Sequence, residues 1–314
     1  MNIAQHPVVA SLTPVFLLIG LGWLAGRLQW IRDGSIKDLS NLVFLLLIPA
    51  LLFRTMSAVR FEQLDLLPVA AYFLAALALL AVSIVWRGFN RGSVVMALAG
   101  TFSNMVMIGI TLVELAYGKA GLVTLLTLVS VHALILLTVG SIVLELAVAR
   151  EARAGGERAP HLLATAWSAI KGALIHPIPL PILCGLLFAQ TGWSLPTVVD
   201  RPLQLLGSAF GPIALVLVGV TLARTSMAGH LRQALWICAS KNLVLPVLVG
   251  ASAWAMGITG LPLTVMVVAA ALPIGANVFL FAQRYEVAQE ITTASMGLST
   301  VLALFTLSLV MLVV

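Results

Sequence analysis

Charged residues and cysteines are scarce in this sequence, and their scarcity excludes several classes of protein. Only 9% of the 314 residues are charged, whereas 61% are hydrophobic and the mean hydropathy is +1.12. A chain of this composition lacks the charge density of a soluble protein surface. Its two cysteines, Cys184 and Cys238, indicate neither a disulfide framework nor a metal site. The composition predicts a polytopic membrane protein, and we expect no cofactor.

Ten apolar stretches fill almost the whole chain. A bilayer core of about 30 Å needs about 20 apolar residues per helix, and each stretch is long enough. The first has no basic region before it and no small-residue cleavage pattern after it, so we expect a retained helix and not a signal peptide. The predicted membrane spans cover residues 8–26, 36–57, 66–86, 93–115, 120–147, 166–190, 202–224, 232–255, 262–283 and 288–313.

Lys and Arg are unevenly divided between the two sets of loops. Eleven lie in or beside the loops that follow the odd-numbered spans. The opposite side holds only four, which are Arg54, Arg60, Lys119 and Arg201. Basic residues accumulate on the cytoplasmic side of a membrane protein. We therefore expect both termini to lie outside the cytoplasm.

One extended polar stretch divides the spans into two sets of five. We interpret residues 150–164 as a cytoplasmic linker between a first repeat, residues 1–149, and a second repeat, residues 165–314. An odd number of helices per half makes the halves enter from opposite faces, which gives the inverted repeat found in many transporters. Two pairs of prolines, whose members are separated by the same number of residues in both pairs, support the repeat. The pairs are Pro14 with Pro177 and Pro49 with Pro212.

Small and polar residues interrupt the fourth and ninth spans near their middles. The interruptions lie at residues 101–109 and 272–279. A backbone interrupted at membrane depth is tolerated only where it is buried in protein or faces a wet cavity. The two spans run antiparallel and place Asn104 and Asn277 at similar depths. We expect these two asparagines to meet near the membrane midplane.

The interruptions are the candidate substrate-binding site. Amides freed at the start of a half-helix carry partial positive charge and can bind a carboxylate. An asparagine side chain adds two N–H donors and an acceptor oxygen. Alternatively, the asparagines only satisfy the broken backbone. The candidate substrate-binding residues are Ser103, Asn104, Lys241, Pro273, Gly275 and Asn277.

Three ionisable side chains lie deep in predicted spans. Lys241 lies about 15 Å from a membrane face, where a charged lysine costs roughly 2.5–3.5 kcal/mol. It is a counter-charge for a carboxylate, a substitute for a coupling sodium ion, or a structural donor to carbonyls at helix ends. His132 and His176 are the candidates for proton coupling, because histidine titrates near neutral pH. The alternative for each histidine is a neutral ring bonded to a carbonyl.

The two interrupted spans carry a family resemblance. The ninth span, from Ala271 to Phe279, resembles the proline-and-asparagine crossover of the auxin efflux carrier family. The fourth span resembles its partner through Asn104 and Gly109, although Thr111 stands where the family usually has a proline. His176 likewise replaces an asparagine common in the family. Other matching residues are Pro49, Leu112, Tyr117, Gly118, Gly185, Pro212, Gly219, Lys241, Pro246, Ala282 and Tyr285.

The resemblance is to bacterial malonate-type carriers of this family, whose fold is similar to that of bile-acid sodium symporters. It implies an all-α membrane protein of ten transmembrane helices in two inverted five-helix repeats, with helices 4 and 9 broken and crossing. It also implies a scaffold half, a crossed-helix transport half, an often dimeric assembly and a place in the bacterial inner membrane. The implied substrates are small organic anions, including dicarboxylates such as malonate.

Two functions from different classes follow. The first is a secondary-active carrier of small organic anions that works by alternating access, coupled to protons, to sodium or to no ion. The second is an intramembrane enzyme acting on a lipid or a small molecule, which would need clustered carboxylates for a metal, or a nucleophile with a base. The eleven acidic residues are scattered, so we predict no enzyme. The expected partners are the anion, membrane lipid and a second copy of the chain, with no nucleic acid.

Overall fold

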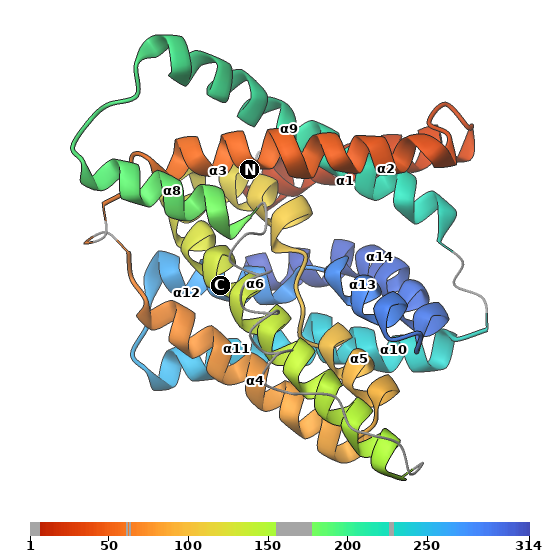
Figure 1. The fold of residues 1–314 in the computed structure, drawn as a ribbon. Helices are drawn as coiled ribbons and strands as arrows, with labels where there is room; N and C mark the ends of the chain where they lie inside the picture. The colour runs from red at the N-terminus through yellow and green to blue at the C-terminus, as the bar shows by residue number, and fades with distance from the viewer. Residues whose placement is uncertain (1–6, 61, 63, 155–177, 226–228) are drawn as a thin grey trace. The chain divides into compact units, whose positions relative to one another are not determined.

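The computed structural model describes residues 7–60, 62, 64–154, 178–225 and 229–314 (Figure 1). These residues are almost entirely helical, and no strand forms among them. Their one β-type pairing is an isolated antiparallel bridge between Ser103 and Ile274. The chain forms two compact units, and each takes segments from both halves of the sequence. The predicted repeats, residues 1–149 and 165–314, therefore do not coincide with these units.

Unit 1 comprises Met1–Leu66, Met105–Ser130 and Ile175–Thr225. Its helices are α1 (Pro7–Arg27), α2 (Asp33–Leu42), η2 (Val43–Leu47), α3 (Ile48–Met56), η4 (Met105–Gly109), the first part of α6 (Ile110–Ala154), α8 (Pro179–Gln190) and α9 (Thr197–Arg224). Helices α1 and α9 pack along each other. A Cβ atom on Gly219 of α9 would lie 2.6 Å from the backbone nitrogen of Trp23. Glycine permits this close approach, as small residues do between membrane helices.

Unit 2 comprises Leu67–Asn104, Val131–Leu174 and Ser226–Val314. Its helices are α4 (Leu67–Arg87), α5 (Arg91–Ala99), the last part of α6, α10 (Leu231–Ala239), η5 (Ser240–Val244), α11 (Leu245–Ala255), α12 (Gly260–Ala271), α13 (Asn277–Arg284) and α14 (Gln289–Val313). Helix α14 packs against α10, α12 and α13. It therefore supports both sides of the interruption between α12 and α13.

Prolines explain two of the wide, π-type turns. Pro49 follows η2 and Pro246 follows η5, each within the first two residues of the next helix. Proline has no N–H and its ring clashes with the carbonyl four residues earlier, so the preceding turn widens. The helices α2–η2–α3 and α10–η5–α11 remain continuous through these turns. They match the predicted spans 36–57 and 232–255.

Helix α6 joins the fourth and fifth predicted spans. Its backbone leaves the helical conformation at Gly118, where φ is 62° and ψ is −157°. Glycine adopts this positive φ without steric cost. The helix then continues to Ala154 and so includes the first residues of the predicted linker 150–164. Residues 155–164 lie outside the described part of the chain.

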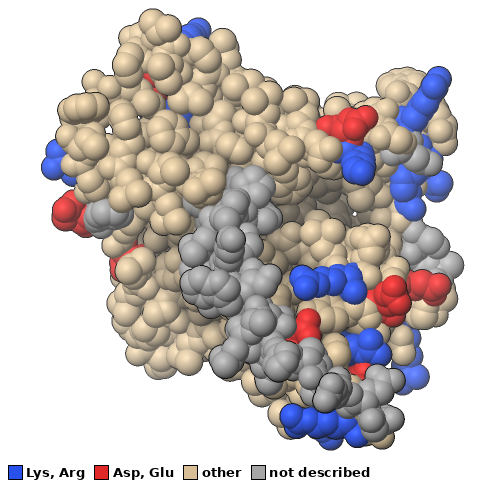
Figure 2. Space-filling model, viewed as in Figure 1, with Lys and Arg blue, Asp and Glu red and all other residues tan. Residues whose placement is uncertain are grey.

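The described chain has the helices of a multi-pass membrane protein. Six are long and apolar enough to cross a bilayer, and three shorter apolar helices accompany them. Large apolar side chains lie exposed on helices, among them Val85 at 82% and Trp254 at 82%. Most of the surface seen in Figure 2 carries neither acidic nor basic side chains. Such a surface fits contact with lipid and not with water.

Candidate substrate-binding site

The helical conformation stops at both predicted interruptions. Helix α5 ends at Ala99, and the hydroxyl of Thr101 donates to the carbonyls of Ala97 and Leu98, each at 3.2 Å. Such local bonding competes with helix continuation. Helix α12 ends at Ala271 because the next residue precedes Pro273, which disfavours the helical conformation before it.

The two interrupted segments pair with each other inside unit 2. The amide of Asn104 donates to the carbonyl of Pro273 at 2.8 Å, and the amide of Gly275 donates to the carbonyl of Phe102 at 2.8 Å. These bonds flank the bridge between Ser103 and Ile274. We call residues 102–104 and 273–275 the paired segments. Their backbone finds here the partners that helix hydrogen bonds would otherwise supply.

Gly275 allows the paired segments to approach closely. A Cβ atom at this position would lie 2.8 Å from the Phe102 ring and 3.1 Å from the carbonyl oxygen of Ser103. Any other residue would force the segments apart. Gly275 therefore shapes the candidate site through its lack of a side chain.

Side chains of η5 and α14 hold the second paired segment in place. The amide of Ile274 donates to the Ser299 hydroxyl at 3.1 Å, and this hydroxyl donates to Asn242 Oδ1 at 2.7 Å. Asn242 Nδ2 donates in turn to the Ser299 carbonyl at 3.1 Å. Sequence reasoning missed Asn242 and Ser299. The available signal was that both are polar residues within apolar spans, and Asn242 adjoins Lys241.

Lys241 belongs to η5 and is fully buried, with its ammonium at the end of α12. Its ammonium donates to the carbonyls of Ala270 at 2.5 Å and Leu272 at 2.6 Å. The last carbonyls of a helix lack partners within the helix and carry partial negative charge, so a buried cation is stabilised there. Within the described residues, no acidic side chain bonds to Lys241. Of the interpretations of Lys241, this contact matches the structural donor.

Asn277 is the first residue of α13 and is half-buried. Among the described residues, no hydrogen bond involves its side chain, and the residue before it, Ala276, supplies no side-chain cap. The first amides of α13 therefore lie next to an unengaged carboxamide. Asn104, also half-buried, lies in the other paired segment. The paired segments thus bring together four of the six candidates, of which Ser103, Pro273 and Gly275 are buried. Asn277 lies two residues after the second segment, and Lys241 bonds to the carbonyl of Leu272, which precedes that segment.

Comparison with known proteins shows the family to which this chain belongs. The family described as "Membrane transport protein" matches residues 7–311, nearly the whole chain. The chain belongs to this family. It is the auxin efflux carrier family that the sequence resembles, and the resemblance is confirmed.

Two relatives cover almost the full length of this transport protein. A protein named "Putative malonate transporter" from Rhizobium meliloti (strain 1021) is 27% identical over 309 residues, which is 96% of this chain and 94% of the relative. A protein named "Auxin efflux carrier component 8" from Arabidopsis thaliana is 24% identical over an alignment of 351 residues that covers 95% of this chain and 95% of the relative. The family and both relatives are membrane transporters, so the enzyme alternative is set aside.

His132 of this transport protein lies against the first paired segment. Its buried ring meets the Phe102 ring edge-on, with 4.6 Å between the two ring centroids. The centroid of the Tyr72 ring lies 6.0 Å from that of His132. The Tyr72 hydroxyl and the Ser103 hydroxyl share a hydrogen bond of 3.0 Å. Among the described residues, His132 Nε2 has no hydrogen-bond partner. His176, the other candidate for proton coupling, lies outside the described residues.

Proposed function

We propose that this protein is a secondary-active carrier of small organic anions, and that the carboxylate binds at the paired segments. The observation that carries the proposal is the carboxamide of Asn277, which lies at the positive end of α13 and bonds to none of the described residues. The amides of Asn104, Ile274 and Gly275 already have acceptors in the bridge and at Ser299. The Asn277 carboxamide takes no part in these bonds, and a carboxylate is the ligand that suits its N–H groups at the start of α13.

The substrate class in this proposal is a carboxylate or dicarboxylate such as malonate. A relative that spans nearly the whole chain is named as a malonate transporter. Ser103 and Asn104 contribute polar groups from the opposite segment, while Pro273 and Gly275 set the path of the backbone. Lys241 holds the carbonyl of Leu272, where its charge also substitutes for a coupling cation. Alternating access then exposes the paired segments to each side of the membrane in turn.

Ten transmembrane helices in two inverted repeats form the architecture of the proposed carrier. The support comes from interruptions in the fourth helix of each half, from their antiparallel pairing and from the equally spaced prolines. Helices 4 and 9 cross at the paired segments in this arrangement. An experimental structure in which residues 1–149 and 165–314 share one membrane orientation would contradict it.

Purified protein in sealed liposomes is expected to take up radiolabelled malonate faster than liposomes without protein, because a carrier supplies a route that the anion lacks through lipid. Preloading the liposomes with unlabelled malonate should accelerate uptake by exchange. Succinate should compete. The absence of protein-dependent uptake for both acids would contradict the proposed function.

Imposed proton and sodium gradients in the same liposomes identify the coupling ion. We propose His132 as the proton-coupling residue, because it contacts Phe102 of the first paired segment and its Nε2 is unengaged. His132→Gln should then remove the acceleration by a proton gradient and leave exchange of malonate intact. An unchanged response to the proton gradient would exclude His132 from coupling.

In the bacterial inner membrane, both termini are expected to lie outside the cytoplasm. Two exposed tryptophans in opposite sets of loops, Trp193 at 76% exposure and Trp30 at 71%, offer matched reporters. In a background without Cys184 and Cys238, an impermeant maleimide should label Trp193→Cys in intact cells. Trp30→Cys should react only after the cells are opened. The reverse pattern would overturn the orientation.

A further inference from the structure

Unit 1 contains a cavity of about 490 Å³ among α1, α3, α6 and α9. Apolar side chains such as Leu18 and Phe210 form part of its wall, and the charged residues Arg54, Glu114 and Lys119 also line it. All of its lining residues belong to unit 1, whereas the paired segments belong to unit 2. The proposed function makes no use of this cavity.

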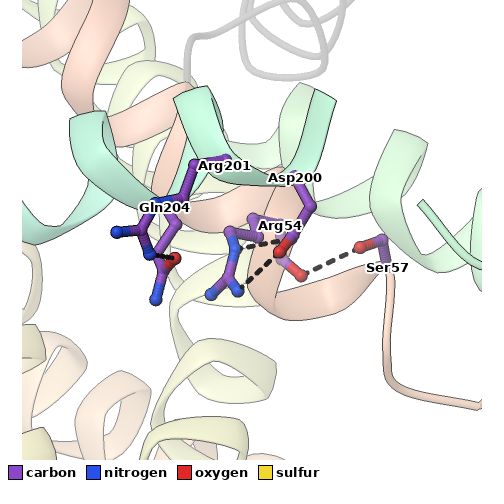
Figure 3. A network of polar contacts seen from close by, with 5 residues as sticks. All are labelled: Arg54, Ser57, Asp200, Arg201 and Gln204. Carbon is purple, nitrogen blue, oxygen red and sulfur yellow. Dashed lines mark hydrogen bonds and ion pairs between the residues drawn. The ribbon is translucent and has the colours of Figure 1, made fainter. Parts of the chain in front are cut away.

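An ion pair orients Arg54, and a hydrogen bond orients Gln204 (Figure 3). Arg54 donates from Nε to Asp200 Oδ1 at 2.7 Å and from Nη2 to Asp200 Oδ2 at 3.1 Å. Arg201 Nη1 donates to the Gln204 carboxamide oxygen at 2.7 Å. These contacts leave Arg54 Nη1 and the Gln204 amide nitrogen without partners in the described residues. Both unengaged groups are hydrogen-bond donors.

Lys119 adds a third unengaged donor. It follows the turn at Gly118, is exposed, and has no hydrogen bond or ion pair with the described residues. Thr111, also on the wall, has a buried hydroxyl without a partner in the described chain. Glu114 is the one acidic residue that lines the cavity. Among the described lining residues, the unengaged donors therefore outnumber this single carboxylate.

The sequence gives an independent reason to notice these cations. The predicted orientation puts four basic residues on the side of the membrane where basic residues are disfavoured. Two of them, Arg54 and Lys119, line the cavity, and a third, Arg201, orients its Gln204. Their gathering at one cavity is unlike a scatter of solvated surface charges.

We infer that this cavity of unit 1 binds the carboxylate of a small organic acid, at a second site formed by residues other than the paired segments. The carboxylate accepts from Lys119 Nζ, Arg54 Nη1 and the Gln204 amide, while the apolar wall contacts the hydrocarbon part of the acid. Asp200 and Arg201 act as positioning residues. The inference rests on the proposed function for the class of ligand, and it adds a second site on the carrier's unit 1.

Binding of malonate and succinate to purified Asn277→Ala protein tests this inference with the first site disabled. Both acids should still raise the melting temperature, since a ligand that binds only the folded state stabilises it. Adding Lys119→Gln should raise the dissociation constant about tenfold or more, the loss expected for one charge-assisted hydrogen bond. Lys119→Arg should restore most of the affinity. Lys37→Gln, an exposed lysine outside the cavity, is the matched control and should change nothing.

Two outcomes would overturn the inference: equal dissociation constants for Lys119→Gln and Lys37→Gln, or no stabilisation of Asn277→Ala protein by either acid. Uptake in liposomes separates this inference from the proposed function. If the protein takes up malonate but its dissociation constant does not depend on Lys119, only the second site is contradicted. Binding that depends on Lys119 without any uptake contradicts the carrier function alone.

Discussion

Asn277→Ala is expected to reduce malonate uptake by roughly a hundredfold, the upper range for loss of hydrogen bonds to a charged ligand group. The side chain lies at the first residue of α13 and engages no described residue. Its removal therefore costs the folded protein little, while a bound carboxylate loses its donors. Uptake by equal amounts of inserted, monodisperse protein is the measurement.

Asn41→Ala supplies the control for this substitution. Asn41 is an exposed asparagine on α2, far in sequence from the interruptions. Its replacement should leave both uptake and melting temperature unchanged. If Asn277→Ala protein transports at the normal rate, the paired segments are not the substrate site. If it fails to fold, the asparagine has a structural role that the described contacts do not reveal.

Lys241→Met is expected to lower the melting temperature by about 5 °C or more. Methionine keeps the length of the side chain but removes the donors to Ala270 and Leu272. A buried acceptor left without a partner costs about 1–3 kcal/mol, and 1 kcal/mol shifts the melting temperature of a chain of this size by roughly 2–4 °C. Removing a buried charge offsets part of that cost. Thermal unfolding of the detergent-purified variant measures the net change in melting temperature from these two effects.

Uptake by the same preparations separates the roles of Lys241. A purely structural donor predicts lower stability with normal uptake per folded molecule. A counter-charge or cation substitute predicts a loss of uptake that exceeds the loss of folded protein, with partial recovery in Lys241→Arg, whose planar group replaces a compact ammonium poorly. We expect a loss of uptake beyond the loss of folded protein, because the charge of Lys241 lies at the carbonyl that precedes the second paired segment. Lys37→Met controls for the loss of one lysine.

The positions of the helices and interruptions could be predicted from the sequence because they depend on local chemistry. Apolar length sets a span, and Pro273 ends α12 wherever the rest of the chain lies. The burial of Lys241 followed from the same reasoning. Its acceptors did not, because the carbonyls of Ala270 and Leu272 become available only when α12 ends beside η5.

Contacts between distant segments were beyond the reach of sequence patterns. The bond between Ile274 and Ser299 and the one between Ser299 and Asn242 connect three separate elements. Single polar residues in apolar spans gave no indication of their partners. The pairing of Arg54 with Asp200 was missed for the same reason, since hydropathy places each near a helix end without saying which ends meet.

The bridge between Ser103 and Ile274 also limits how the carrier can change shape. Separating the paired segments would leave the amides of Asn104 and Gly275 without acceptors, at a cost of about 1–3 kcal/mol each in a dry interior. A motion that keeps the bridge avoids this cost. The two interruptions should therefore travel as one rigid body during a transport cycle, and any hinge should lie elsewhere in the chain.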